Sequence, residues 1–388
     1  MKYLRKFKQN ISLFFLTGFL FSCTNTGNSA PNQLITANNV KVPIENSIKI
    51  ALLLDTSGSM DGLLEQAKSQ LWKIVNQLAL AKKDDKNAIV EIAIYQYGND
   101  ALNSKEGYIE NVLALTSDLD KISEKLFSLR TNGGQEYCGH VIRTAINQLD
   151  WNKSKEELNL IFIAGNEPFN QGKVDYKTSC KNAVENNITI NTIFCGNVNE
   201  GISTFWQNGA ILANGSYMNI DMNEKTVYIE TPFDKEISFL NDSLNDTYLN
   251  YGRLGYSKKR NQKNQDYNST NYGVANSVSR TISKSSHLYK NKSWDLVDAK
   301  KEKDFDINKI KSSTLPVEMQ NMTPEEKLKY IELKSKKRIK IINKINALNK
   351  KRIAYIKKIE SEHGEQNSLD NGMIKAIKKQ AKAKGYTF

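Results

Sequence analysis

The sequence has few of the residues on which common catalytic sites depend. Its 388 residues include only three histidines: His140, His287 and His363. No Gly-x-Ser-x-Gly elbow, phosphate-binding glycine loop or glycosidase-like carboxylate pair stands out. A serine nucleophile would therefore lack a recognisable base. These absences argue against an enzyme, and we expect a protein that binds rather than catalyses.

No apolar run at the N-terminus is long enough to span a bilayer as a helix. The run from Ile11 to Phe21 follows a cationic start and ends at Leu20-Phe21-Ser22-Cys23. That tetrapeptide resembles the bacterial lipobox. We expect residues 1–22 to be a lipoprotein signal peptide and Cys23 to be lipidated, with an uncleaved anchor as the alternative. The protein would then lie in the bacterial cell envelope, at the outer membrane or periplasmic face rather than in the cytoplasm.

Acidic residues do not balance the basic ones. The formal net charge is +13, and from Lys301 onward about 22 Lys and Arg stand against about 11 Asp and Glu. The excess therefore lies mainly in the tail. The tail could contact anionic phospholipid, lipopolysaccharide or an acidic partner, or simply keep the protein soluble. Nucleic acid is not expected, because the chain is exported and the tail lacks interleaved aromatics.

Apolar segments of two kinds alternate along the first part of the chain. Strand-like segments cover residues 48–55, 90–95, 108–115, 158–164, 188–194 and 217–221. Helical segments cover residues 64–78, 118–129, 136–149, 176–186 and 196–213. This alternation predicts an α/β fold with a doubly wound, mainly parallel sheet.

Composition divides the rest of the chain. Residues 23–46 read as a flexible tether, 47–239 as the α/β domain and 240–322 as a loosely ordered, partly helical region. Residues 323–388 form a basic helical tail, since Thr323-Pro324-Glu325-Glu326 is a strong helix start. We expect its long helix to reach about Ser361 and to pack on a neighbouring helix.

The most informative stretch is Asp55-Thr56-Ser57-Gly58-Ser59-Met60, directly after the first strand. In open parallel sheets, ligands bind outside the carboxyl ends of the strands, so Asp55, Ser57 and Ser59 should converge there. Their three oxygens can occupy one face of the octahedron that Mg²⁺ requires.

This stretch resembles the metal-ion-dependent adhesion site (MIDAS) of von Willebrand factor A (VWA) domains. The resemblance covers about Ser47 to Phe239 and implies a Rossmann-like sheet of six strands, five of them parallel. It also implies a protein-binding module that holds Mg²⁺ or Ca²⁺ at Asp55, Ser57 and Ser59. An acidic side chain of a protein partner would complete the shell of that ion.

The other segments at the sheet edge depart from the family pattern. Gln135 stands where a threonine is expected, with Thr131 nearby, and Gly165 stands where an aspartate is expected. Glu167 is a candidate replacement ligand, and a solvated acid before a proline turn is the alternative interpretation. Further candidates at the rim are Thr131, Gln135, Glu136 and Asn166. We therefore expect a partial site, with a metal-free scaffold as the alternative and a metal-dependent hydrolase as the weaker one.

Three cysteines remain after Cys23, an odd number in an oxidising compartment. Cys138, Cys180 and Cys195 are all placed near the same edge of the predicted sheet. A disulfide between Cys138 and Cys180 is one interpretation, and three small buried side chains are the other.

Overall fold

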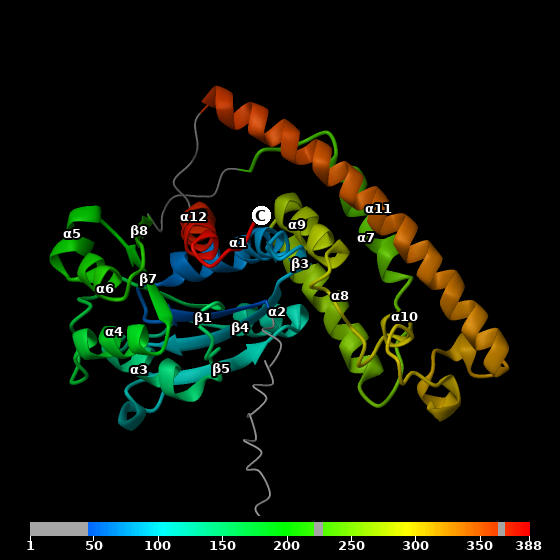
Figure 1. Ribbon diagram of the computed structural model, residues 1–388, viewed down its shortest axis with the longest axis horizontal. Helices are drawn as coiled ribbons and strands as arrows, with labels where there is room; N and C mark the ends of the chain where they lie inside the picture. The colour runs from blue at the N-terminus through cyan, green and yellow to red at the C-terminus, as the bar shows by residue number, and fades with distance from the viewer. Residues whose placement is uncertain (1–45, 221–227, 364–368) are drawn as a thin grey trace, which may run out of the picture. The chain divides into compact units, whose positions relative to one another are not determined.

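The computed structural model describes residues 46–220, 228–363 and 369–388 (Figure 1). The expected signal peptide, Cys23 and nearly all of the expected tether lie outside the described residues. The described residues form one compact unit. None of the helices in the described ranges has the length and apolar character needed to cross a bilayer.

A six-stranded sheet lies at the centre. Its strands stand in the order β5-β4-β1-β6-β7-β8, and among them only β4 and β5 pair antiparallel. Their bounds are β1 Ser47–Asp55, β4 Ile89–Tyr97, β5 Ile109–Thr116, β6 Leu158–Gly165, β7 Ile188–Cys195 and β8 Tyr217–Ile220. The predicted α/β fold with a mainly parallel sheet is confirmed.

Both faces of the sheet are covered, which explains the nearly continuous apolar strands. In β1, Ile48 and Ile50 enter the core on one face, whereas Ala51 and Leu53 enter the core on the other. One face carries α1 Asp61–Leu78 and α2 Leu119–Ser128. The other carries α3 Cys138–Gln148, α4 Tyr176–Glu185 and α6 Trp206–Leu212 (Figure 1).

The helix expected over residues 196–213 is two helices. The first, α5, spans Val198–Ser203, and α6 begins at Trp206. Phe205 between them has φ +73°, a left-handed conformation that a right-handed helix cannot contain.

The later helices extend the α1 side of the molecule. They are α7 Asp234–Asn245, α8 Gly255–Asn271, α9 Val274–Ser285, α10 Leu296–Ala299, α11 Pro324–His363 and α12 Leu369–Lys382. Short elements complete the list: β2 Lys82–Lys83, β3 Lys86–Asn87 and 3-10 turns at Ser104–Glu106, Ile307–Lys309, Ser312–Thr314 and Val317–Met319. Apolar residues of α7, α9, α11 and α12 belong to the same core as α1 and the sheet.

Residues 240–322 are therefore not the loosely ordered region that the sequence suggested. A buried ionic cluster joins this region to the sheet domain. Arg280 of α9, only 1% exposed, pairs with Asp120 of α2 and, at 2.9 Å, with Asp266 of α8. Lys284 pairs with Asp266 at 2.8 Å, and the Tyr289 hydroxyl donates to Asp120 at 2.7 Å. The cluster fixes α8 and α9 against α2.

Two further arginines hold the long helix α11. Arg338 pairs with Asp295 at 2.7 Å and stacks on Tyr248, and Arg352 pairs with Asp234 at 2.9 Å. The expected packing of this helix on a neighbour is confirmed, because its apolar side meets the core shared with α7 and α9.

The last helix returns to the sheet. The Gln380 side chain of α12 exchanges amide hydrogen bonds with Asn191 of β7, at 2.6 and 3.1 Å. Thr387 then pairs with Lys82 of the β2–β3 hairpin.

Candidate cation-binding site

The candidate site lies at the carboxyl ends of β1, β4 and β6. β1 is central, and its register places Asp55 beside Tyr97 of β4 and Leu54 beside Ala164 of β6. β4, which comes earlier in the chain, pairs with one side of β1, and β6, which comes later, pairs with the other side. This is a topological switch point, where open α/β sheets bind ligands.

Two buried carboxyl groups face each other at this edge. Asp55 is fully buried and Glu136 is 5% exposed. Asp55 Oδ1 accepts a hydrogen bond of 2.7 Å from the Ser57 amide. Asp55 Oδ2 and Glu136 Oε2 are buried atoms with no hydrogen-bond partner. Buried carboxylate oxygens normally have partners, so this pair is an exception that requires an explanation.

The electrostatics reflect this crowding. Burial, followed by the neighbouring Glu136 carboxyl, raises the pKa of Asp55 well above its ordinary value. Burial also raises the pKa of Glu136. The neighbouring Asp55 and Ser57 side chains counteract this rise, and the charge of Glu167 adds to it. Two adjacent carboxyl groups cannot easily ionise together unless a positive charge lies between them.

Two glycines leave the space that this pair occupies. A Cβ at Gly98 would lie 2.8 Å from Asp55 Oδ1 and 2.8 Å from Glu136 Cγ, and its φ of +77° also favours glycine. A Cβ at Gly165 would lie 3.1 Å from Asp55 Oδ2 and 2.6 Å from the Tyr97 hydroxyl. Gly165 thus lies directly against the free oxygen of Asp55.

The two serines lie beside the carboxyl pair. Ser57 Oγ and Ser59 Oγ are 3.3 Å apart, Ser57 is buried and Ser59 is exposed. Asn166 donates to Ser59 Oγ at 3.1 Å. The structure therefore brings together Asp55, Ser57, Ser59, Glu136 and Asn166 from the sequence-based candidates.

The remaining candidates contribute less. Thr131 donates to Asp61, and Gln135 is exposed. The charge of Glu167 acts on Glu136. The backbone carbonyl of Glu167 accepts a hydrogen bond of 2.8 Å from the Trp206 indole N–H.

The residues present fit a divalent cation. No three His, Cys, Asp or Glu side chains within the described ranges form a metal-binding group. Two carboxylates and two hydroxyls are nevertheless hard oxygen donors of the kind that Mg²⁺ and Ca²⁺ prefer. The two unpartnered carboxylate oxygens are where such an ion would be bound.

Comparison with known families agrees with this geometry. Residues 49–203 match the family model of the von Willebrand factor type A domain. Residues 49–203 of this chain are therefore similar to that domain. No curated protein matches the chain.

Several solved structures resemble slightly less than half of this chain. The SpRpn10 VWA domain is 18% identical and has a TM-score of 0.36, and the match covers 46% of this chain and 90% of the SpRpn10 chain. The conserved hypothetical protein BatB from Bacteroides thetaiotaomicron is 17% identical, covers 45% and 90%, and has a TM-score of 0.34. Proximal thread matrix protein 1 from the mussel byssus, with a zinc-occupied MIDAS motif, is 13% identical, covers 46% and 43%, and has a TM-score of 0.35.

The sequence analysis did not include the end of β4, at Tyr97 and Gly98, in the candidate site. Tyr97, Gly98 and Cys138 surround the carboxyl pair: the Tyr97 hydroxyl donates to the Ala164 carbonyl at 2.9 Å and lies 3.8 Å from Cys138 Sγ. The glycine directly after the buried strand β4 was the available signal, because β4 ends at the same edge as β1.

The interpretation of a disulfide between Cys138 and Cys180 is wrong for this structure. Cys138, Cys180 and Cys195 are all free and buried. Cys180 Sγ lies 3.5 Å from the Gly209 carbonyl, whereas Cys138 Sγ packs against Tyr97. The two thiols contact different neighbours. The other interpretation, three small buried side chains, therefore holds for this structure.

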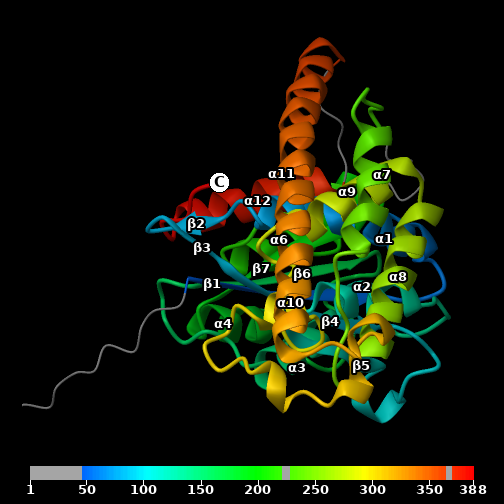
Figure 2. The ribbon, with the colours of Figure 1, turned by 90° about the vertical axis from the view of Figure 1, so that its right-hand side faces the viewer.

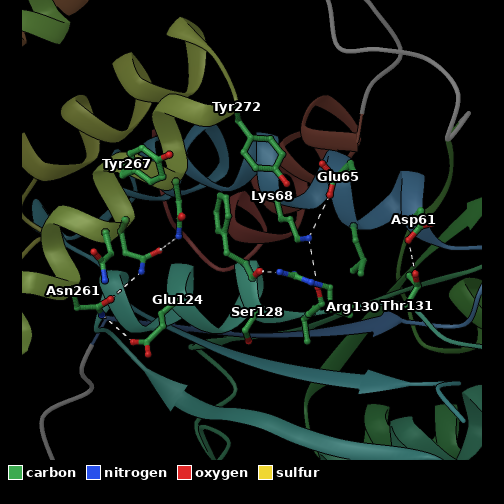
Figure 3. Close-up of a pocket in the computed structure, with 16 residues that line it drawn as sticks. Asp61, Glu65, Lys68, Glu124, Ser128, Arg130, Thr131, Asn261, Tyr267 and Tyr272 are labelled. Atoms are coloured by element: carbon green, nitrogen blue, oxygen red, sulfur yellow. Dashed lines mark hydrogen bonds and ion pairs between the residues drawn. The ribbon is translucent and has the colours of Figure 1, made fainter. Parts of the chain in front are cut away.

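A polar cleft of about 680 Å³ lies between α1, α2 and α8 (Figure 3). Asp61 and Thr131 lie at its edge, with Glu65 and Lys68 of α1 beside them. The opposite wall is α8, whose Asn261 donates to Glu124 of α2 at 2.9 Å. The cleft exists because α8 packs beside α2 through polar side chains.

Proposed function

We propose that this protein is a protein-binding module that acts through a divalent cation, Mg²⁺ or Ca²⁺, at the VWA rim. Asp55, Glu136, Ser57 and Ser59 would hold the ion. An acidic side chain of the partner would complete its coordination. The cation would supply positive charge that attracts that carboxylate.

The observation that carries the proposal is the pair of unpartnered, buried carboxylate oxygens on Asp55 and Glu136. Leaving such atoms unsatisfied costs about 1–3 kcal/mol each, and more when they are charged. A bound cation removes that cost and lets both groups ionise. Glu136 thereby takes the place of the aspartate that the family pattern puts at position 165.

The residues around the pair define how a partner would reach the ion. Ser59 is exposed, and Asn166 and Glu167 are half-buried at the same edge. Asn166 orients the Ser59 hydroxyl through its amide. Tyr97, Gly98 and Gly165 close the inner side, so a partner carboxylate would approach past Ser59.

We also propose that the protein is not an enzyme and is held in the bacterial cell envelope by lipid on Cys23. The support for the anchor is the lipobox-like sequence before Cys23. The metal-free scaffold is the second candidate, and the glycine at position 165 favours it, because one expected ligand is missing.

The experiment is a cross-linked pulldown from envelope extracts with the full chain, in Mg²⁺ or in chelator. Asp55→Asn removes a ligand, and Asp150→Asn is the matched control because the Asp150 side chain is 97% exposed. The proposal expects a partner that is recovered with wild type and Asp150→Asn, and lost with chelator or Asp55→Asn. Recovery that is equal in all four conditions would favour the scaffold.

A further inference from the structure

The outer face of α11 carries an unusual concentration of positive charge. From Leu333 to Ile359 the helix has eleven lysines and arginines and no aspartate or glutamate. Arg338, Arg352 and Lys344 are paired with acids of the same chain. The other lysines of this segment include four exposed side chains that are used below: Lys336, Lys340, Lys351 and Lys358.

These four lysines, which we call the lysine stripe, share one side of the helix. At about 100° per residue they fall within an arc of about 60°. Ile341, Ile345 and Leu348 lie on an arc whose centre is about 120° away, and they enter the core. At about 1.5 Å per residue the stripe extends over about 33 Å. Figure 2 looks onto the outer side of α11, which lies in front of the other elements.

The chemistry of the stripe matches a flat, diffuse anion rather than a shaped one. Lysine is a flexible point charge that imposes no pairing geometry, unlike the bidentate fork of arginine. The arginines of this segment are turned inward, where Arg338 and Arg352 make directional ion pairs. All the basic residues on the outer arc are therefore lysines.

Exposed apolar side chains lie next to these charges. Leu333 is 62% exposed on the same arc, and Tyr355 is 37% exposed at its border. Apolar and aromatic side chains among lysines suit the headgroup region of a bilayer, where the charges meet lipid phosphates and the apolar groups enter below them.

We propose that α11 is a docking surface for an anionic phospholipid bilayer, with the lysine stripe facing the headgroups. This inference does not depend on the cation at the VWA rim. A bilayer is favoured over a protein partner because the charge is spread along a single straight helix. None of the residues that line the polar cleft of Figure 3 belongs to α11.

The test is lysine acetylation footprinting of the full chain, read by mass spectrometry. The probes are vesicles of phosphatidylcholine alone or with added phosphatidylglycerol. Phosphatidylglycerol should slow acetylation of the stripe several-fold and leave the exposed Lys153, Lys173, Lys177 and Lys181 near α4 unchanged. Because the readout is local, an anchor elsewhere in the chain does not produce it.

A matched pair of variants completes the test. K336E/K340E/K351E/K358E and K153E/K173E/K177E/K181E change the net charge equally. Each lysine at an anionic surface contributes roughly a fivefold gain in partitioning. The gain in vesicle binding on adding phosphatidylglycerol should therefore fall at least about a hundredfold in the first variant and persist in the second.

Three results would overturn the proposal. They are equal protection with both vesicles, an equal loss in both variants, and protection of the stripe by DNA or an acidic protein but not by phosphatidylglycerol. Unchanged circular dichroism and melting of the two variants show that the comparison concerns the surface and not the fold.

Discussion

Replacing Arg280 by methionine should strongly destabilise the protein. Arg280 is 1% exposed and is shared by Asp120 and Asp266. Methionine keeps much of the packing on Trp72, which lies 4.5 Å from the guanidinium, but removes the charge. Two buried carboxylates then lose a cationic partner. Breaking a buried ion pair from one side costs about 3–5 kcal/mol, and we expect a loss of that size.

The assay is urea denaturation followed by circular dichroism, with Lys344→Met as the control. Lys344 and Glu236 form an exposed pair at 2.6 Å, with 55% and 46% of their side chains accessible. Such pairs contribute about 0–1 kcal/mol. Adding Asp120→Asn to Arg280→Met should recover part of the loss, because one stranded charge disappears. A loss below about 1 kcal/mol for Arg280→Met would refute the buried cluster.

Three further predictions concern the carboxyl pair, acid stability and the thiols. Asp55→Asn should raise the melting temperature in chelator, since it removes one of two crowded carboxyl groups; the gain should be about 1.4 kcal/mol for each unit by which the pKa of Asp55 is raised, and a lower melting temperature would contradict the repulsion from Glu136. Burial opposes ionisation of Asp266, but the charges of Lys284 and Arg280 and the hydrogen bonds from Lys284 and Asn245 together outweigh it and lower the pKa of Asp266. Its stabilisation is therefore complete above the unfolded pKa of about 3.9 and is lost as the pH falls below it, so stability measured between about pH 5 and pH 3 should fall less in Asp266→Asn. Burial raises the pKa of Cys180 to about 12, and the three buried thiols should react with a thiol reagent only after urea unfolds the chain; rapid labelling of the native protein would show that they are accessible.

The α/β half of the molecule could be predicted because its signals are local. Strands β1, β6 and β7 are apolar on both faces, and the turn after β1 places the Asp55 loop at the switch point. The long helix α11 carried its own start signal at Thr323 and Pro324, and it extends to His363.

The packing of α8 could not be predicted in this way. Its buried residues include Gln262, Gln265 and Ser269, so the helix has no apolar stripe. It is held by side-chain hydrogen bonds, such as Ser123 to Gln265 at 2.8 Å and Gln262 to the Tyr289 hydroxyl at 3.1 Å. Such partners are distant in sequence, and composition alone made the region look loosely ordered.

The role of Glu136 was only partly visible for the same reason. Its acidity marked it as a candidate, but the space for its carboxyl beside Asp55 comes from Gly98 of another loop. Glu167, the favoured sequence candidate, follows β6 at the same edge of the sheet, where its charge acts on Glu136. Which of two neighbouring acids faces Asp55 depends on the tertiary contacts of the loops.

In the proposed function, Asp55 and Glu136 share a divalent cation with Ser57 and Ser59. Isothermal titration of Mg²⁺ and Ca²⁺ into the chelator-treated chain tests it most directly, with Glu136→Gln and the exposed Asp150→Asn as the matched pair. We expect one cation-binding site per chain in the wild type and in Asp150→Asn, and we expect this site to be lost in Glu136→Gln. Binding that is unchanged in Glu136→Gln, or absent from the wild type for both ions, would contradict it.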